Sequence, residues 1–379
     1  MKSTTLGLLL ENADGRPEGF NYLRLILALL VIASHAPIIV WGTFGYDLMW
    51  KLPVLPFAKL IVPMFFALSG FLVAASFERT KTLGMFYGLR AVRIFPALAF
   101  DTIVSALILG PVFTQFSLSA YFSDPLFIRY WLNILGEPQF SLPGVFLDHP
   151  VSGIVNSQLW TIPLELGCYL SIGAIGLLGG QKRLWVAPVA ALVATIVYPA
   201  MQAIKQQELL VDSRMSGMLI VACFLWGVTF YQHRNRVTGS IWSAIVSVVL
   251  GMVLMSLHVG GGIFGCAAPF FLAHATAVLG CLNPKPSRFS SYADYSYGLY
   301  LYGFPMQQVL VHFSWIPREP VTNFVLAVGL SGVMAAISWK YVEKPALKLR
   351  PMLKDLEKRW LERQAGKAPA AAHGAMAGE

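Results

Sequence analysis

Apolar stretches of about twenty residues recur along the whole chain, separated by short charged or Pro/Gly-rich breaks. An α-helix needs about 20 mostly apolar residues to cross a hydrocarbon core about 30 Å thick. The pattern therefore predicts an all-α, polytopic membrane protein of about ten transmembrane helices. The expected spans are residues 22–42, 57–77, 94–114, 159–179, 184–203, 215–231, 238–257, 262–281, 294–313 and 321–340.

The low content of charged residues agrees with lipid as the solvent. Only 12% of the 379 residues are charged and 56% are hydrophobic, whereas a soluble domain carries about 25% charged residues. A soluble globular protein is therefore a poor fit. The segment before the first span includes the charged residues Glu11, Asp14, Arg16 and Glu18 and has no small-residue cleavage site after an apolar core. We expect this span to remain as an anchor.

The basic residues indicate how the chain is oriented. The formal net charge is +9, and a basic membrane protein usually owes such an excess to its cytoplasmic loops. If both termini are cytoplasmic, most of the 28 Lys and Arg residues fall in segments on the inside. The positive-inside rule therefore predicts cytoplasmic termini, and the excess charge requires no nucleic-acid partner.

Two segments differ from the spans in character. The connection from about Gln115 to Gln158 is the longest on the outside, and its aromatic residues and prolines favour an ordered cap. We assign residues 1–350 to one integral membrane domain and residues 351–379 to a cytoplasmic, partly disordered tail. The Ala- and Gly-rich end from Gly366 to Glu379 is typical of disorder.

The four cysteines all lie inside apolar runs, at Cys168, Cys223, Cys266 and Cys281. There they behave as small hydrophobic side chains, and they are too dispersed for a metal-ligand motif. We expect no disulfide, no metal site and no permanently bound cofactor.

Arg24 and His35 are the first candidates for function, because ionisable side chains inside a span are costly. Ten residues separate them, so on one helix the histidine lies ~16 Å deeper than the arginine. The arginine can then meet a cytosolic phosphate while the imidazole lies near the midplane. The alternative is that His35 is a satisfied structural group, which is the commoner case for a lone histidine on an apolar helix.

Five further sequence blocks favour the functional interpretation. They are Pro63–Leu72 (PMFFALSGFL), Arg90–Pro96 (RAVRIFP), Asn156–Glu165 (NSQLWTIPLE), Tyr295–Leu301 (YSYGLYL) and Tyr341–Pro345 (YVEKP). In this order, and with the Arg24-to-His35 spacing, they resemble the acyltransferase-3 family of integral membrane O-acyltransferases. The resemblance covers roughly residues 19–346, and its most specific parts are that spacing and the Arg-x-x-Arg block.

The resemblance implies a bacterial inner-membrane enzyme that takes an acyl group, with acetyl as the first choice, from an acyl-CoA such as acetyl-CoA. The implied acceptor is a hydroxyl of a cell-surface carbohydrate, such as an exopolysaccharide, a lipopolysaccharide or a lipid-linked unit. Membrane lipid, acyl-CoA and the glycan are the expected partners, and a homo-oligomer is left open. Gly303 departs from the pattern, because many relatives have histidine there, so no catalytic role is carried over to it.

The chemistry of the reaction agrees with this implication at His35. Transfer from a thioester to a hydroxyl needs a base of near-neutral pKa, which imidazole supplies. Imidazole is also a competent nucleophile toward thioesters, so a covalent acyl carrier stays open beside the general base. Glu165, a little more than one turn inside its helix, is expected to orient His35 or to accept a sugar hydroxyl. The predicted catalytic residues are His35, Glu165 and Arg24.

Arg90 and Arg93 lie one helical turn apart at the cytosolic entry of the third span. The forked donors of a guanidinium group suit the phosphates of coenzyme A. With Arg24 they form the predicted acyl-CoA site. The alternative is that the pair serves only as a topology anchor.

Trp160, Asn156 and Tyr297, from the matching blocks, are the predicted acceptor-binding residues. An indole is a good platform for the face of a sugar. Trp160 is explained equally well as an interfacial belt residue.

The remaining polar residues receive structural predictions. Asp101 is expected to make a bond between helices, and His274 is expected to be structural. The pair Ser69–Gly70 is expected to permit close helix packing rather than to act as a nucleophile. Glu343 is interpreted as half of a surface pair with Lys344.

Two other function classes compete with the enzyme. A secondary transporter of a glycan or small acid would be expected to show internal repeats and helices broken at matched positions, and the sequence shows neither. A sensor or assembly scaffold would differ from the enzyme in leaving acetyl-CoA unconsumed.

Overall fold

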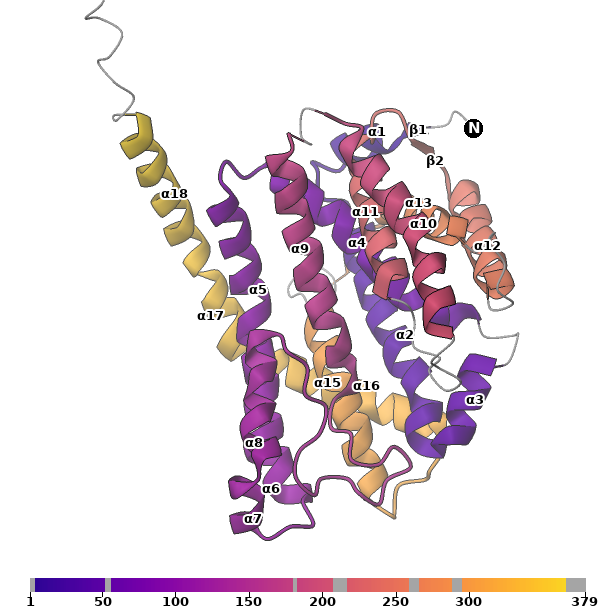
Figure 1. The fold of residues 1–379 in the computed structure, drawn as a ribbon, viewed down its shortest axis with the longest axis vertical. Helices are drawn as coiled ribbons and strands as arrows, with labels where there is room; N and C mark the ends of the chain where they lie inside the picture. Colours follow the sequence, from indigo (N-terminus) through magenta and orange to yellow (C-terminus); the bar gives the residue numbers. More distant parts are fainter. Residues whose placement is uncertain are drawn as a thin grey trace, which may run out of the picture.

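The computed structural model is built almost entirely of helices (Figure 1) and describes residues 4–51, 56–179, 183–206, 217–258, 266–287 and 295–365. The first half of the chain forms α1 (Leu6–Glu11), α2 (Gly19–Trp41), α3 (Thr43–Lys51), α4 (Pro56–Glu78), α5 (Leu83–Val104), the π-helical turn η1 (Ser105–Leu109), α6 (Gly110–Phe113), α7 (Leu118–Ser123), α8 (Pro125–Tyr130) and the 3₁₀ turn η2 (Trp131–Leu135).

The second half begins with the 3₁₀ turn η3 (Ser157–Thr161), which leads directly into α9 (Ile162–Leu177). It continues with α10 (Val186–Gln206), α11 (Gly217–Gln232), α12 (Ile241–His258), α13 (Ala268–Cys281), α15 (Tyr295–His312), α16 (Pro320–Ser338), the π-helical turn η5 (Trp339–Glu343), α17 (Lys344–Leu347) and α18 (Leu349–Ala365). Two short strands, β1 (Thr4–Thr5) and β2 (Thr238–Gly239), pair antiparallel.

The helices have the length and surface of membrane spans. Among the described residues, five helical segments are long and apolar enough to cross a membrane, and α10 to α13 are shorter apolar helices. On α12, Trp242, Ile245, Val249 and Val253 follow helical spacing and are exposed. A soluble protein rarely exposes such a stripe. The prediction of an all-α, multi-pass membrane protein is therefore confirmed at this level, and a helix lies within each predicted span.

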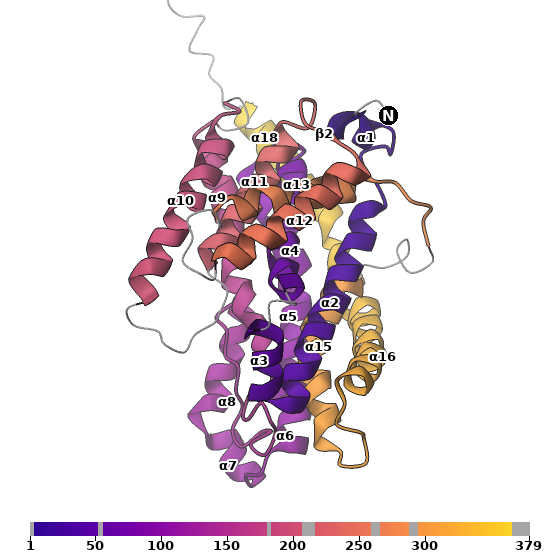
Figure 2. The same cartoon turned by 90° about the vertical axis from the view of Figure 1, so that its right-hand side faces the viewer.

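The two ends of the molecule differ in structure (Figures 1 and 2). The short helices α6, α7 and α8 lie at one end, whereas α1, the β1–β2 ribbon and the C-terminal end of α18 lie at the other. α2, α4, α5, α9 and α15 run between these ends. The two π-helical turns, η1 and η5, continue α5 and α16, and η5 packs against α5.

The centre of the bundle is the contact between α4 and α11. A Cβ atom on Gly70 would collide with the backbone carbonyl oxygen of Phe224, and one on Gly227 would collide with that of Ala67. Small residues at such positions let two helix backbones approach closely. The prediction that Ser69–Gly70 serves close helix packing is confirmed at Gly70.

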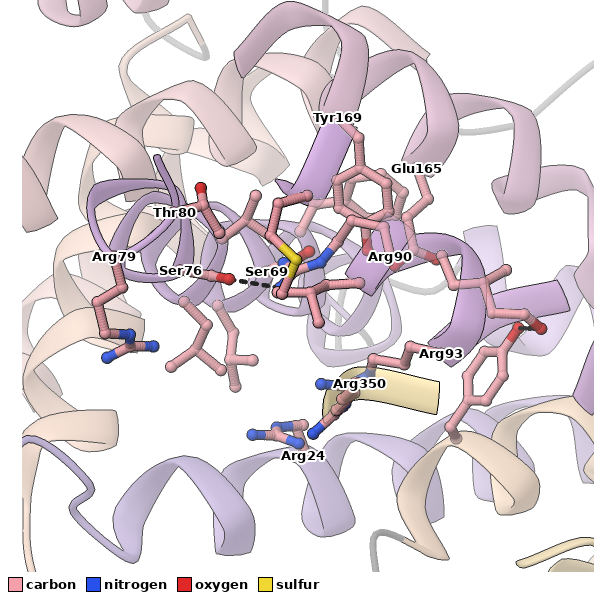
Figure 3. A pocket seen from close by; sticks show the side chains of 18 of the residues that line it. Arg24, Ser69, Ser76, Arg79, Thr80, Arg90, Arg93, Glu165, Tyr169 and Arg350 are labelled. Atoms are coloured by element: carbon pink, nitrogen blue, oxygen red, sulfur yellow. Dashed lines mark hydrogen bonds between the residues drawn. The ribbon is translucent and has the colours of Figure 1, made fainter. Parts of the chain in front are cut away.

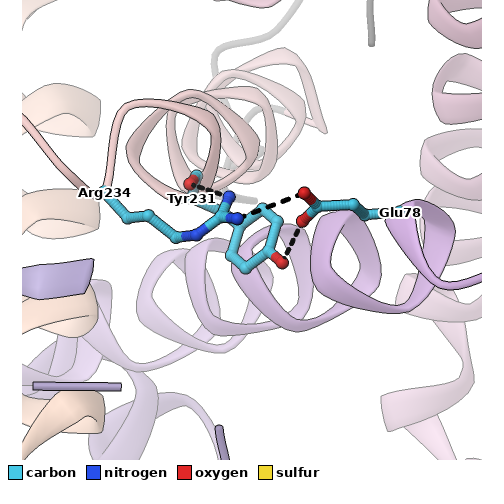
Figure 4. Close-up of polar contacts among 3 residues, drawn as sticks. All are labelled: Glu78, Tyr231 and Arg234. Carbon is cyan, nitrogen blue, oxygen red and sulfur yellow. Dashed lines mark hydrogen bonds and ion pairs between the residues drawn. The ribbon is translucent and has the colours of Figure 1, made fainter. Parts of the chain in front are cut away.

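A polar clasp joins the same two helices where they end (Figure 4). Tyr231 on α11 donates a hydrogen bond to the Glu78 carboxylate at the end of α4. Arg234 Nη2 donates to Glu78 at 3.1 Å, and the Arg234 guanidinium lies 4.3 Å from the centre of the Tyr231 ring. The Arg234 carbonyl oxygen also accepts from the Gly7 N–H at 2.8 Å, so the N-terminal helix α1 is fastened to the same place.

The segment between α6 and η3 forms the predicted ordered cap. Tyr121, Tyr130 and Phe146 are buried together in a small hydrophobic core. Tyr121 donates a hydrogen bond to the Ala106 carbonyl oxygen at 2.7 Å, which ties the cap to η1. His149 lies 3.1 Å from Gln308 on α15, and burial lowers the pKa of its imidazole. A neutral His149 can donate through Nδ1 to the Gln308 side-chain oxygen, so the cap is tied to α15 as well.

Two parts of the sequence-based prediction need correction. α5 begins at Leu83, not near residue 94, because Thr82 caps it by accepting a hydrogen bond from the Met85 N–H at 3.1 Å. The surface-pair prediction for Glu343 is wrong. Within η5 this residue is only 7% exposed, and it accepts a hydrogen bond from Ser338 Oγ at 2.8 Å.

The predicted boundary at residue 350 falls just inside α18, which continues to Ala365. The expected disordered end from Gly366 to Glu379 lies outside the described residues.

We predict that Gly227→Ala destabilises the protein although alanine favours helix. The added methyl meets the Ala67 backbone, and overpacking of a close contact costs about 1–3 kcal/mol. The matched control is Gly329→Ala on α16, where an added Cβ meets nothing within 4 Å and helix propensity should hold or raise stability. Thermal melts of both variants in detergent provide the measurement. Equal midpoints for the two variants would show that the α4–α11 contact is not tight.

Candidate active site

A cavity of about 930 Å³ lies between α2, α4, α5, α9, α15 and α18. At the end near α1 its walls carry Arg79, Lys81 and Lys358. Farther along the same helices, toward the cap, it is lined by Val62, Phe65, Thr161 and Tyr300. The cavity is thus basic near one face of the protein and becomes more apolar with depth.

The walls of this cavity are strongly basic. Its lining includes Arg24 from α2, Arg90 and Arg93 from α5, and Arg350 and Lys354 from α18, whereas the acidic residues that line it within the described part of the chain are Glu165, Glu357 and Glu362. Figure 3 shows the guanidinium groups of Arg24, Arg93 and Arg350 directed into the same part of the cavity. The three arginines predicted from the sequence are therefore brought together from two helices. Such an excess of positive charge suits an anionic ligand.

Arg90 is held in place by its neighbours. Its Nη2 donates a hydrogen bond to Ser76 Oγ on α4 at 2.7 Å (Figure 3). Its guanidinium carbon lies 5.5 Å from the ring centre of Phe86 and 5.8 Å from that of Tyr169. These contacts hold the guanidinium group at the cavity wall.

Glu165 lies in the first turn of α9, where a carboxylate is favoured by the helix dipole. Tyr169, one turn further along, donates a hydrogen bond to it. Its charge also acts on Arg90 and Arg93 across the cavity. The carboxylate is therefore part of the arginine-rich wall, and its hydrogen bond runs to Tyr169 rather than to His35.

His35 lies just beyond the deep end of the cavity, on α2. Its Nδ1 is 3.5 Å from the side-chain amide of Gln158, and its ring meets Phe304 edge-on, with the centres 5.5 Å apart. Gln158 links it to the cavity. The Tyr300 hydroxyl donates to the Gln158 carbonyl oxygen at 3.1 Å and lies 2.7 Å from Thr161 Oγ1, and both Tyr300 and Thr161 line the cavity wall.

The three predicted acceptor residues have different surroundings. Tyr297 lines the cavity, and its hydroxyl donates to the Ile94 carbonyl oxygen at 3.4 Å. Asn156 is fully buried and bonds Asp101 at 3.2 Å and the Leu301 carbonyl oxygen at 2.9 Å. Trp160 is partly buried against the main hydrophobic core.

The structural predictions for two polar residues are confirmed. Asp101 makes the expected bond between elements, because Asn156 joins it from the N-cap of η3. His274 on α13 is hydrogen-bonded to Ser247 on α12 through Nδ1 at 2.8 Å, which joins two neighbouring helices. The thiols of Cys168, Cys223 and Cys281 are free and buried.

Sequence reasoning missed the basic residues of α18. Arg350, Lys354 and Lys358 are four residues apart, so they share one face of the helix, and that face lines the cavity. The spacing was a readable signal. Gln158 was also missed as a residue of the site, because only the fold brings it to His35.

Comparison with known proteins shows the family of this chain. A profile of the acyltransferase domain matches residues 18–342, which is most of the chain. The chain belongs to the acyltransferase-3 family. The match begins just before α2 and ends within η5, so α18, with Arg350 and Lys354, lies beyond the matched part of this acyltransferase.

Two relatives align over nearly their whole length. The acyltransferase is 26% identical over 331 residues to a protein named O-acetyl transferase from Shigella phage Sf6, an alignment that covers 86% of this chain and 94% of the relative. It is 27% identical over 386 residues to a protein named Nodulation protein 10 from Rhizobium leguminosarum bv. viciae, with 90% and 96% covered. No solved structure matches the chain. The chain is thus a membrane O-acyltransferase.

The basic helix α18 is fastened to the cavity by one carboxylate. Glu357 Oε1 accepts hydrogen bonds from the Lys81 N–H at 3.2 Å, the Thr82 N–H at 2.9 Å and Thr82 Oγ1 at 2.8 Å. Thr82 is the N-cap of α5, where free backbone N–H groups favour a negative charge.

We predict that Glu357→Ala loosens α18 from the cavity, because three hydrogen bonds to one carboxylate oxygen are lost together. Hydrogen exchange followed by mass spectrometry should show faster deuterium uptake in residues 349–365 and around Thr82. Asp355→Ala is the control, since Asp355 is exposed on the same helix. Equal uptake in the two variants would mean that Glu357 does not hold the helix.

Proposed function

We propose that this protein transfers an acyl group, with acetyl as the leading candidate, from acyl-CoA to a hydroxyl of a cell-surface carbohydrate. An exopolysaccharide or its lipid-linked unit is the acceptor class we favour. The observation that carries the proposal is the cavity lined by arginines on three helices, with His35 beyond its deep end. The printed name of the phage relative, O-acetyl transferase, supports acetyl as the group.

The cavity has the charge and size that an acyl-CoA donor requires. Coenzyme A carries several phosphate charges at one end and an acyl thioester at the other. The arginines of the cavity wall suit the phosphates, because guanidinium groups bind phosphate oxygens through paired donors. At about 930 Å³, the cavity is at the upper end of the range of about 300–1,000 Å³ for small-molecule sites. Arg350 and Lys354 of α18 extend the proposed phosphate site.

The reaction we propose uses His35 as the general base. Its imidazole takes the proton of the acceptor hydroxyl while that oxygen attacks the thioester carbonyl carbon. A C–O bond forms, the C–S bond breaks, and the thiolate of coenzyme A leaves and receives a proton from the imidazolium group. In the carrier variant, His35 itself is acylated first, which predicts exchange of labelled coenzyme A into acyl-CoA without any acceptor.

Glu165 and Arg24 contribute to this scheme from the cavity wall. Arg24 lies on the same helix as His35, so donor binding and the base share one rigid element. Glu165 balances part of the positive charge of Arg90 and Arg93. We infer that it positions these guanidinium groups for the donor.

For the acceptor we retain Trp160 and Tyr297 as candidates for contact, and Asn156 as a residue that supports the site. Asn156 is fully buried, so its proposed contribution is to hold the chain before η3 in place and not to touch the sugar. Tyr297 lines the cavity and is placed to contact either substrate.

The proposed setting is the bacterial inner membrane, crossed ten times, with both termini in the cytosol. The location of α1 and the end of α18 at the same end of the molecule supports termini on one side (Figure 1). The cavity carries its arginines toward that end, where cytosolic acyl-CoA would enter. Membrane lipid would cover the apolar outer helices.

We predict that Arg90→Ala and Arg93→Ala raise the KM for acetyl-CoA more than they lower kcat. Each arginine should contact the donor phosphates before and during transfer alike, so uniform binding is lost. A hydrogen bond to a charged group contributes about 1.5–3 kcal/mol, so its loss should raise the KM for acetyl-CoA by about 10–100-fold. Arg129→Ala in the exposed part of the cap is the control. If both variants bind the donor with unchanged affinity while remaining folded, the pair serves only as a topology anchor.

We predict that His35→Gln abolishes transfer, leaving at most about one per cent of the rate, since general-base catalysis contributes about 10²–10⁴-fold. Glutamine keeps a polar side chain but cannot take the proton. His274→Gln is the matched control, because that histidine joins α12 to α13 and is not among the residues that line the cavity. Purified variants of equal monodispersity would be assayed for glycan acylation. A folded His35→Gln protein with near wild-type turnover would reject the catalytic assignment.

A further inference from the structure

Gln158 connects the cavity wall to His35 and has no role in the scheme above. It lies in η3, the turn that leads into α9, and its side chain is 1% exposed. Its backbone carbonyl oxygen accepts from the Tyr300 hydroxyl, while its side-chain amide faces Nδ1 of His35 at 3.5 Å. A buried amide needs partners for both its oxygen and its nitrogen.

One orientation of this amide satisfies its neighbours. With the oxygen toward α15, it accepts from the Phe304 N–H at 3.1 Å, and its NH₂ group donates to the Tyr300 carbonyl oxygen. Tyr300 and Phe304 are four residues apart on α15, and Pro305 follows Phe304. The amide of Gln158 therefore bonds to both backbone groups of one i, i+4 pair of this helix. In this orientation the atom that faces His35 Nδ1 is the amide oxygen.

An oxygen at this position determines which histidine nitrogen carries the proton. A carbonyl oxygen only accepts hydrogen bonds, so it favours the neutral imidazole with hydrogen on Nδ1. The lone pair is then on Nε2, on the opposite side of the ring, where it is available to accept a proton.

Gly303 provides the space for this arrangement. A Cβ atom there would lie 2.8 Å from Ile32 Cγ1 and 3.4 Å from the Gln158 side-chain nitrogen position. Any larger side chain at 303 would compete with the Gln158 amide for the same place. The absence of a side chain at Gly303 thus leaves room for the amide that enters from η3.

We propose that Gln158 is the positioning residue of the catalytic base: its amide oxygen accepts the Nδ1–H of His35, so that Nε2 is the basic nitrogen, and Gly303 admits the amide. The kinetic consequence of this inference rests on the proposed function. The tautomer of His35 does not, because it can be measured in the protein without substrate.

The kinetic test compares Gln158→Leu with Gln158→Glu. Leucine removes the acceptor, so kcat should fall about 10–100-fold, as for loss of other groups that orient a histidine, with the KM for acetyl-CoA unchanged. A carboxylate keeps the acceptor and stabilises imidazolium, so Gln158→Glu should stay active with the acid limb of its kcat–pH profile moved up by about one pH unit or more. Gln307→Glu is the control, because it places a carboxylate at another buried glutamine, on α15. It should not shift the kcat–pH profile.

If Gln158 has only a structural role, a different outcome is expected. Its loss would lower stability in both variants and would leave the pH profile of the remaining activity unmoved. That result, or wild-type kcat in folded Gln158→Leu, would overturn the proposal. Gly303→His should reduce kcat in the wild-type background and recover part of it when combined with Gln158→Ser.

The tautomer is tested without any activity. Solid-state ¹⁵N NMR of histidine-labelled protein, with the His35 signal identified by its absence from His35→Gln, should show hydrogen on Nδ1 in the wild type and a mixture in Gln158→Leu. A wild-type protein with hydrogen on Nε2 would disprove the inference whatever its activity. A wild-type protein with the expected tautomer that consumes no acyl-CoA would instead disprove the proposed function alone.

Discussion

The placement of several guanidinium groups in one cavity of a lipid-embedded protein is the constraint on which this structure depends. Arg24, Arg90, Arg93 and Arg350 face a common space, and like charges at such spacing repel strongly where the dielectric constant is low. Exposed to hydrocarbon, each would cost several kcal/mol. The fold compensates with the Glu165 carboxylate, the Ser76 hydroxyl and aromatic faces. In the proposed function, the phosphates of the acyl-CoA donor would compensate the remaining positive charge.

The helices that build the basic end of the cavity also build the surroundings of His35, the proposed base. α2 carries Arg24 and His35 about 16 Å apart along its axis, and α15 carries Tyr297 at the cavity wall and Phe304 against the imidazole. The close α4–α11 contact at Gly70 and Gly227, and the clasp on Glu78, hold the wall that α4 contributes. A donor bound by its phosphates would therefore be presented to a base whose distance is set by rigid helices and not by loops.

The sequence predicted the helices well because apolar length is a local property. It also predicted Arg24, Arg90 and Arg93 as one site, since their spacing on two helices is readable. It missed the first part of α5, which is less apolar than a span and contributes Met85, Arg90 and Arg93 to the cavity wall. It placed Glu343 on the surface because a neighbouring lysine suggested a pair, whereas the π-helical turn buries it. Gln158 could not be found, because its contact with His35 joins residues 123 positions apart.

The central claim is that one cavity binds the donor by its phosphates and presents its thioester to His35. The most direct measurement is a cryo-EM structure of the protein with a non-hydrolysable acetyl-CoA analogue. The account predicts ligand density in the cavity, with the phosphates against Arg90, Arg93 and Arg350 and the acyl end at Thr161 and Tyr300, next to His35. Density elsewhere, or a ligand whose acyl end lies at the arginines, would contradict it.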